Sequence, residues 1–466
     1  MKKRIRKQQR SNKRNTQLRP IADRLAAGKT LRAKVPRGDH AKWSPPRRRR
    51  DPIEILIESS EGRVAELVPI RYGRMMQSPF AFYRGAAAIM AADLAHTQVT
   101  RLLVQASGDC HLLNFGAFAT PERRIIFDLN DFDETLPGPW EWDVKRLVAS
   151  FVIASRNNKL KRAEGQAAAR SCARSYRKWM RRYAEMHPLE LWYCRIDAET
   201  AVASLTDKAS ISRLKSRIEA AEKQNVPEHD FPKLVSVNGG APRISDNPPL
   251  IFHPRDAESE AFRKDAHHTF AKYRETLPDE RRLLLDRFTI VDVAQKVVGV
   301  GSVGTWCGIL LMMTGDEVPL FLQVKEARRS VLEPYAGPSV YAHRGQRVVV
   351  GQRLMQSASD MFLGWTEGPA GRHFYLRQLR DMKITPLVEV FSGAVMAEYA
   401  SLCGWALARA HARSGDAATI AGYLGSSGAF DDAIAAFGDR YADQNERDFE
   451  ALKAAVESGR VEAFVE

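Results

Sequence analysis

The fold is decided by residues 297–327, which read VVGVGSVGTWCGILLMMTGDEVPLFLQVKEA. Gly299, Gly301 and Gly304 have the GxGxxG spacing, which is a weak signal by itself. A dinucleotide-binding fingerprint requires a helix directly after the glycines. Here the following residues are apolar and rich in strand formers. The pattern therefore predicts a strand, a glycine loop, a second strand and, after the turn TGDEVP, a third strand that carries Lys325.

A glycine loop between two strands is the form of the flap that covers nucleotide phosphates in kinases. In this interpretation the backbone N–H groups of the loop bind the phosphates, and the strand lysine reaches the α- and β-phosphates. The alternative is an ordinary hairpin with turn glycines and a solvated lysine. The candidate nucleotide-binding residues are Gly299, Gly301, Ser302, Gly304, Thr305 and Lys325.

A second motif, GDCHLLNFG at residues 108–116, places Asp109 and Asn114 five positions apart. This is the spacing of the phosphotransferase catalytic loop, in which the aspartate accepts or positions the substrate proton and the asparagine binds Mg²⁺. The pattern Gly-Asp-x-His-x-x-Asn is similar to the loop of aminoglycoside and other small-molecule kinases. Asp109 is therefore the candidate base, and His111 is a further candidate in the same loop.

After this loop the sequence predicts a strand, IIFDL, and residues 127–134, FDLNDFDE, place four acids at its end, where a kinase holds the carboxylate that binds Mg²⁺. Asp131 is the first choice for this ligand because Asp143 follows it by twelve residues, which resembles small-molecule kinases. Asp128 is the second choice because the number of residues between it and Asn114 is closer to the number usual in kinases. Asp133 is the third choice. The alternative is a turn, because turns attract Asp and Asn.

These motifs occur in an order that ordinary kinases do not have. Kinases run from the glycine loop and lysine through helix C, the hinge and helix E to the catalytic loop and the metal-binding acid. Here the catalytic loop precedes the glycine loop by about 190 residues. A circular permutation reconciles the two orders if the cut lies in an exposed loop. Residues 400–416, ASLCGWALARAHARSGD, support it because they resemble helix E with its Leu-Ala-x-x-His ending.

Seven segments together resemble the bacterial family catalogued as domain of unknown function 2252. They are RYGRMMQSPFAFYRGAAAIMAADLA (71–95), GDCHLLNFGAF (108–118), FDLNDFDETLPGPWEWDVKRLVAS (127–150), VVGVGSVGT (297–305), QVKEA (323–327), FYLRQLRDMK (374–383) and YADQNERDFEAL (441–452). The resemblance covers nearly all of the chain from about residue 25. It implies a kinase-like fold and no particular substrate.

The helix expected to correspond to helix C, residues 345–362, offers glutamines but no glutamate to pair with Lys325. Glu326 or Glu333, which precede it, would have to take that role, or the lysine is held differently. Arg84, like Arg71 nearby, precedes the catalytic loop and is suited to bind an acceptor substrate or a phosphate. Internal ion pairs with the acidic centre are the alternative.

The net charge of the 466-residue chain is +15, but residues 1–50 alone carry +17, which leaves −2 on residues 51–466. We expect residues 1–50 to form a basic, flexible arm that is either solvated or bound weakly to an anionic partner.

No apolar run of 18 residues and no secretory signal is present, so we expect a cytoplasmic protein without a membrane span. Five scattered cysteines favour neither a disulfide framework nor a structural metal.

The expected fold is α+β: a circularly permuted, kinase-like, two-lobed fold with a small antiparallel β lobe and a large helical lobe. Its expected parts are the arm at 1–50, a helical lobe with the catalytic loop and metal-binding acids at 51–285, a β-rich nucleotide lobe at 286–385, and C-terminal helices at 386–466 that pack on the helical lobe. Local patterns predict helices over 52–68, 79–98, 391–411 and 430–456, and a strand over 373–379.

The leading hypothesis is an ATP- and Mg²⁺-dependent phosphotransferase that acts on a small molecule or a protein. One alternative is a nucleotide-binding regulator without turnover that docks on an acidic partner or nucleic acid through the basic arm. The other is a kinase-like enzyme that transfers the AMP group instead of the γ-phosphate.

Overall fold

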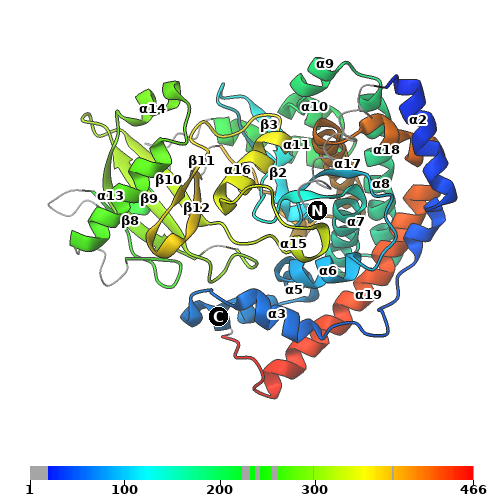
Figure 1. Ribbon diagram of the computed structural model, residues 1–466, viewed down its shortest axis with the longest axis horizontal. Coiled ribbons are helices and arrows are strands. Elements are labelled where there is room, and N and C mark those ends of the chain that lie inside the picture. Colours follow the sequence, from blue (N-terminus) through cyan, green and yellow to red (C-terminus); the bar gives the residue numbers. More distant parts are fainter. Residues whose placement is uncertain are drawn as a thin grey trace, which may run out of the picture.

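The computed structural model describes residues 19–222, 231–236, 242–253, 260–297, 299–379 and 382–464. A sheet with its own helices forms one side of the molecule, and a bundle of long helices forms the other (Figure 1). The α+β class predicted from the sequence is confirmed. Within the described residues, no helix is both long and apolar enough to span a bilayer.

The main sheet has six strands in the order β11-β12-β10-β9-β8-β7, and every pair is antiparallel. Its strands are β7 (Ile251–Phe252), β8 (Thr289–Lys296), β9 (Cys307–Met313), β10 (Pro319–Glu326), β11 (Gly364–Glu367) and β12 (His373–Gln378). The predicted succession of strand, glycine loop, strand, turn and lysine-bearing strand is confirmed. β9 and β10 are buried along nearly their whole length because helices and loops cover both faces of the sheet.

Helix α16 (Arg344–Met355) follows β10 in the chain and packs on β11, β12 and the long helix α17 (Gly393–Ser414). Helix α13 (Glu260–Arg274) packs on β11, where the hydroxyl of Tyr273 donates a hydrogen bond to the carbonyl of Phe362 at 2.5 Å. The β-rich part of the chain therefore extends to residues before the predicted boundary at 286, since β7 and α13 belong to it.

The bundle is built around α7 (Trp140–Asn157), α8 (Arg162–Ala184), α17, α18 (Ala417–Leu424) and α19 (Ala429–Glu457). The indole of Trp140 stacks on Tyr176 with ring centroids 5.7 Å apart, which joins α7 to α8 inside the core. The C-terminal helices α17, α18 and α19 pack on α7 and α8. The predicted helix over 79–98 is two helices, α5 (Pro79–Gly85) and α6 (Ala87–Leu94).

Three two-stranded sheets and several short helices complete the described chain. The small sheets pair β1 (Leu103–Ala106) with β4 (Leu136–Pro139), β2 (Phe115–Ala119) with β3 (Ile125–Leu129), and β5 (Val235–Ser236) with β6 (Arg243–Ile244). The remaining helices are α3 (Pro52–Ser60), α4 (Val68–Met75), α9 (Pro188–Tyr193), α10 (Ala198–Ala203), α11 (Lys208–Glu222), α12 (Phe231–Leu234), α14 (Asp279–Leu285) and α15 (Glu333–Ala336).

The prediction of a flexible arm over residues 1–50 is wrong for residues 19–50, and residues 1–18 lie outside the described chain. Helix α2 (Ile21–Thr30) packs closely on α18: a Cβ atom added to Gly28 would lie 2.0 Å from the carbonyl oxygen of Thr419. Arg49 forms ion pairs with Asp93 at 2.7 Å and with Asp448 at 2.6 Å. The sequence misled because these basic side chains meet acids that lie far away along the chain.

Candidate functional site

Lys325, near the end of β10, meets the acidic stretch that follows β3 (Ile125–Leu129). Its Nζ atom lies 2.6 Å from Oδ2 of Asp133 and 3.8 Å from Oδ1 of Asp131. The Lys325 side chain is only 6% exposed, whereas 36% of the Asp131 side chain remains exposed. The sheet and the acidic stretch are thus joined by a buried ion pair between residues 192 positions apart.

Strand pairing explains why other polar side chains gather here. In the β10–β12 register Lys325 is opposite Tyr375 and Gln323 is opposite Arg377, so alternate residues of the two strands point to one face. The hydroxyl of Tyr375 donates a hydrogen bond to Oδ1 of Asp133 at 2.6 Å. Arg377 donates from Nη1 to the carbonyl of Asn130 at 3.1 Å. Both β12 side chains fix the acidic stretch against the sheet.

Burial and mutual charge set the protonation of this cluster. Burial and repulsion from Asp133 raise the pKa of Asp131. Burial alone would raise the pKa of Asp133, but the charge of Lys325 and hydrogen bonds from Lys325 and Tyr375 outweigh it and hold the pKa below its ordinary value. Burial opposes the charge on Lys325, yet Asp131 and Asp133 raise its pKa well above the ordinary range. The lysine is therefore cationic and Asp133 anionic at neutral pH.

Asp109 lies in the loop between β1 and β2 and is bound by an arginine that the sequence had not singled out. Both Nε and Nη2 of Arg146, on α7, donate to Oδ1 of Asp109, with the Nε contact at 2.7 Å. Burial raises the pKa of Asp109, and the charge of Arg146 opposes part of that effect. Asn114 donates from Nδ2 to the carbonyl of Asp109 at 2.6 Å, a contact that does not use its amide oxygen.

Asp143 holds the loop that carries Asp109. It lies inside the first turn of α7 and accepts hydrogen bonds from the backbone N–H groups of Ser107 at 2.6 Å and Gly108 at 3.0 Å. Nε2 of His411, near the end of α17, lies 3.1 Å from the same carboxylate. A buried carboxylate with these partners fixes the loop backbone relative to two helices.

The glycine loop is tied to the helical side of the molecule. Gly299 and Gly304 have φ angles of +69° and +84°, which favour glycine. Nη1 of Arg63 donates to the carbonyl of Val303 at 2.5 Å, and the N–H of Val64 donates to the carbonyl of Gly304 at 2.7 Å. Residue 298 of the motif lies outside the described chain.

These segments enclose a cavity of about 250 Å³, which we call the charged cavity. The loop residues Gly301, Ser302 and Thr305 line it from one side, and Asp109, Asp131 and Asp133 line it from another. Five arginines also line it, namely Arg63, Arg71, Arg84, Arg328 and Arg329. Residues predicted from three separated motifs therefore meet at one cavity.

Three other candidates are engaged elsewhere. Asp128 is fully buried and binds Nη2 of Arg409 at 2.6 Å and the hydroxyl of Ser357 at 2.9 Å, so it does not face the charged cavity. Glu333 lies 3.9 Å from Arg329, whereas the ion pairs of Lys325 within the described chain are with Asp131 and Asp133.

His111 is 5% exposed, and its Nδ1 accepts a hydrogen bond from the N–H of Leu113 at 3.2 Å. Burial and the charges of Arg146 and Arg84 lower its pKa well below the ordinary value. A neutral imidazole in this position stabilises the loop after Asp109, and its Nε2 lies 4.0 Å from Oδ2 of Asp109.

Sequence reasoning missed Arg146, Tyr375, Arg377 and Arg347. The last of these lies on α16, where a kinase would carry its glutamate, and donates to the carbonyl oxygens of Thr135 at 2.6 Å and Asp133 at 2.7 Å. A signal existed for two of them: in FYLRQL, Tyr375 and Arg377 alternate with apolar residues and share one face of a strand. Nothing local distinguishes Arg146 or Arg347 from surface arginines.

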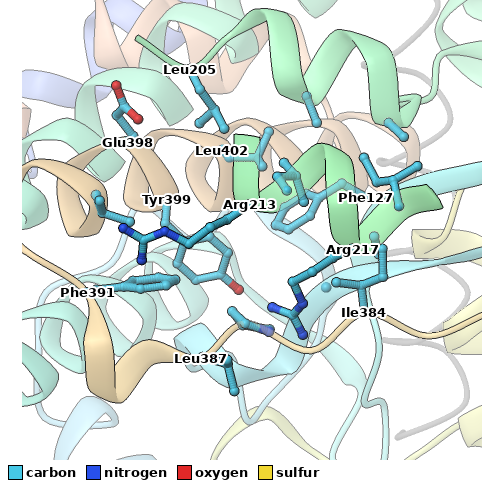
Figure 2. Close-up of a pocket in the computed structure, with 18 of the residues that line it drawn as sticks. Phe127, Leu205, Arg213, Arg217, Ile384, Leu387, Phe391, Glu398, Tyr399 and Leu402 are labelled. Carbon is cyan, nitrogen blue, oxygen red and sulfur yellow. The ribbon is translucent and has the colours of Figure 1, made fainter. Parts of the chain in front are cut away.

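Two further cavities lie outside this cluster. One, of about 590 Å³, lies between the sheet, α16 and the β2–β3 hairpin and is lined by Gln323, Arg377 and Asn130 among others. The other, of about 520 Å³, is the apolar cavity between α11, α17 and the hairpin. Figure 2 shows Arg213 and Arg217 extending into it from α11, among walls that include Phe127, Phe391 and Tyr399.

Among the residues that the structure describes, no group of three or more His, Cys, Asp or Glu side chains is arranged to hold a metal ion. Mg²⁺ commonly takes one or two carboxylates and completes its shell with water and substrate phosphates. The half-exposed Asp131 and the amide oxygen of Asn114 have the chemistry for such a site.

The fold and the site define an α+β protein in which a glycine loop and a group of aspartates line one charged cavity, and a buried lysine pairs with one of these aspartates. The chain belongs to the family described as an uncharacterized protein conserved in bacteria (DUF2252), whose model matches residues 63–455. This match confirms the family resemblance seen in the sequence. Comparison with curated proteins and with solved structures gives no significant match.

Proposed function

We propose that this protein is an ATP- and Mg²⁺-dependent phosphotransferase with a circularly permuted, kinase-like fold. One observation carries the proposal: Lys325 contacts Asp133 at 2.6 Å beside a glycine loop, and Asp109 lines the same cavity. A glycine loop, a lysine and carboxylates that meet at one cavity are the parts that phosphoryl transfer requires. The turn interpretation of the acids gives no reason for this convergence.

Two observations favour the permutation. From β8 onward the chain runs through the glycine loop, the lysine strand, α16, two strands and α17, which is the kinase order. The end of α17 then lies against the start of the other half, because the N–H of Gln105, in β1, donates to Oγ of Ser414 at 3.0 Å. A helix that ends beside the strand leading to Asp109 is what an unpermuted chain would connect directly.

In this proposal the loop residues Gly301, Ser302 and Thr305 bind phosphate oxygens, and Lys325 exchanges part of its contact with Asp133 for the nucleotide. Asp131 and Asn114 would hold Mg²⁺, which supplies charge neutralisation on the phosphates. The cavity of about 590 Å³ beside Gln323 and Arg377 is the site for the base and ribose, because it adjoins Asn130 and the acidic stretch.

Asp109 acts as the base. Arg146 binds its Oδ1 atom, so Oδ2 is the oxygen that accepts the proton of an acceptor hydroxyl. The hydroxyl oxygen forms a bond to the γ-phosphorus while the bond between that phosphorus and the β-phosphate oxygen breaks. ADP leaves, and the proton remains on Asp109 until water removes it.

The test uses purified full-length protein with Mg²⁺ and ATP labelled at either the γ- or the α-phosphate. Label from the γ-position in the protein, in an added acceptor or in released phosphate supports the proposal, and label from the α-position would indicate AMP transfer. Asp109→Asn should lose about 10³-fold in rate and retain nucleotide binding. Asp286→Asn, in an exposed ion pair with Arg274, is the matched control and should keep full activity.

The second candidate is a nucleotide-binding regulator without turnover. The observation that favours it is that α16 offers Arg347 instead of a glutamate, so Lys325 is held by the aspartates that would otherwise bind the metal. Nucleotide binding without any transferred label, with Asp109→Asn equal to the wild type, would establish this candidate. Removal of residues 1–18 tests whether the basic terminus adds a docking role.

A further inference from the structure

Four arginines gather on one wall of the charged cavity, and we call them the arginine cluster: Arg63, Arg71, Arg84 and Arg328. The first three belong to the segment from the end of α3 to α5, and Arg328 directly follows the lysine strand. The wall is therefore made largely by the chain before β1, outside the glycine loop and the acidic stretch.

Arg63 and Arg328 share a hydrogen-bond acceptor, and Arg71 bonds to groups next to that acceptor and next to Arg84. The carbonyl of Ser59 accepts from Nε of Arg63 at 3.0 Å and from Nη1 of Arg328 at 3.1 Å. Arg71 donates to Oγ of Ser60 at 2.9 Å and to the carbonyl of Gly85, the residue after Arg84, at 2.9 Å.

The cluster has no carboxylate partner. Within the described residues, the hydrogen-bond acceptors of Arg63, Arg71 and Arg328 are carbonyl and hydroxyl oxygens, and none of the four arginines forms an ion pair. The carboxylates that line the same cavity contact other groups. Asp109 binds Arg146, Asp133 binds Lys325 and Glu58 binds Arg50, whereas Glu134 and Glu326 accept hydrogen bonds from the backbone N–H groups of Val331 and Trp306. Burial, with the charge of Arg328, lowers the pKa of Arg71 to about 10. Arg71 is buried and the other three arginines are half-buried, and a cation at such a position without a carboxylate in ion-pair contact is costly unless a ligand supplies one.

Capping of α3 accounts for only part of this arrangement. Carbonyl oxygens at a helix C-terminus attract cations, which explains Arg63 and Arg328. It does not explain Arg84, whose Nε atom is buried without a hydrogen-bond partner in the described chain. Nε of Arg71 is in the same condition, and Arg71 is only 2% exposed. A buried donor without an acceptor is costly, and the adjoining cavity has room for an anionic ligand beside the other nitrogens of these two guanidinium groups.

We propose that the arginine cluster binds the phosphate group of a small phosphorylated acceptor, whose hydroxyl is then presented to Asp109. The inference rests on the proposed function for the hydroxyl, but the phosphate site stands on the cluster alone. Four guanidinium groups suit a dianion, and their forked donors match phosphate oxygens. A cavity of about 250 Å³ accommodates a small molecule and leaves little room for a protein segment.

The experiment measures inorganic phosphate binding to the full-length protein by isothermal titration calorimetry, with and without a saturating Mg²⁺ complex of a non-hydrolysable ATP analogue. Wild type should bind phosphate under both conditions. Arg84→Gln should weaken binding at least tenfold, and Arg328→Gln should do the same. Arg372→Gln, an exposed arginine before β12, is the control and should bind like the wild type. Melting temperatures check that each variant is folded.

Three results would overturn the proposal: no phosphate binding in the millimolar range, wild-type affinity in both cluster variants, or complete competition by the ATP analogue. The last result would assign the arginines to the phosphates of the nucleotide. Failure of nucleotide binding with phosphate binding intact would refute the proposed function and leave the anion site standing, so the two failures are distinguishable.

Discussion

The charged cavity and the apolar cavity differ in the kinds of side chain that line them. The charged cavity is built from side chains that are costly to bury, and it brings together residues from five separated parts of the chain. The apolar cavity is twice as large, but its walls are mostly ordinary core side chains, such as Phe127 and Tyr399. Size therefore says less about function here than the concentration of charge, which folding alone does not favour.

The largest change in nucleotide affinity should come from Lys325→Met, which removes the ammonium group that pairs with Asp133 beside the charged cavity and nearly keeps the length of the side chain. We expect nucleotide affinity to fall about a hundredfold, since a buried charged contact contributes about 3 kcal/mol to binding. Titration calorimetry with Mg²⁺-ATP measures the change, and a melting curve monitors folding because Asp133 loses its partner.

Lys453→Met is the control for this variant, since Lys453 pairs with Glu450 on the outer face of α19. It should bind nucleotide like the wild type. If Lys325→Met binds nucleotide as tightly as the wild type, the charged cavity is not the nucleotide site. The functional difference proposed between the two cavities would then be wrong.

A smaller effect is expected from Gly304→Ala in the glycine loop. Gly304 has φ +84°, and an added Cβ would lie 3.1 Å from Cβ of Arg63. We expect a loss of about 1–2 kcal/mol in stability and weaker nucleotide binding, both measurable by denaturant unfolding and calorimetry. Gly315→Ala, in the turn between β9 and β10, is the matched control because an added Cβ meets no atom within 4 Å. Equal behaviour of the two variants would contradict the account of the loop.

Glu134 makes the charged cavity sensitive to pH. Burial raises its pKa from 4.5 to about 7, and Arg347 opposes part of this shift. The folded state binds the proton of Glu134 more tightly than the unfolded state does. The contribution of this group to the free energy of unfolding should therefore be highest below pH 4.5 and should decrease as the pH rises toward 7. Glu134→Gln should flatten this part of the profile by up to about 2 kcal/mol. Chemical denaturation at several pH values measures the profile. If Glu134→Gln shows the same dependence of stability on pH as the wild type, Glu134 is not the group responsible.

The smallest effect should come from the apolar cavity. Arg217→Gln removes the hydrogen bond from Nη2 to the carbonyl of Thr385, which measures 2.6 Å. We expect a loss below about 1 kcal/mol in stability, because the contact is exposed, and no change in nucleotide affinity. A clear loss of nucleotide binding in this variant would show that the two cavities are coupled or that their roles are reversed.

Local patterns were sufficient for much of the fold and for part of the site. Alternation and turn residues located the strand with Lys325 and the hairpin before it, and motif spacing selected Asp109 and Asp131. The partners of these residues could not be read in the same way. Arg146 and Tyr375 act on Asp109 and Asp133 from elements far away in the sequence, and their roles follow from packing.

The basic N-terminal segment illustrates the same limit. Composition suggested an arm, yet Arg49 binds two buried acids, Asp93 and Asp448, which are 44 and 399 positions away. Charge counted along a sequence does not report which charges become neighbours. For Asp128 the sequence suggested a metal ligand, but the structure shows an internal ion pair. Its carboxylate is buried and binds Arg409.

The most direct test is a crystal structure of the full-length protein with Mg²⁺ and a non-hydrolysable ATP analogue. We predict that the phosphates lie between the glycine loop and Lys325, with the metal on Asp131 and Asn114 and the base beside Gln323. A nucleotide bound elsewhere, with Lys325 still paired to Asp133 and the loop unoccupied, would contradict the account.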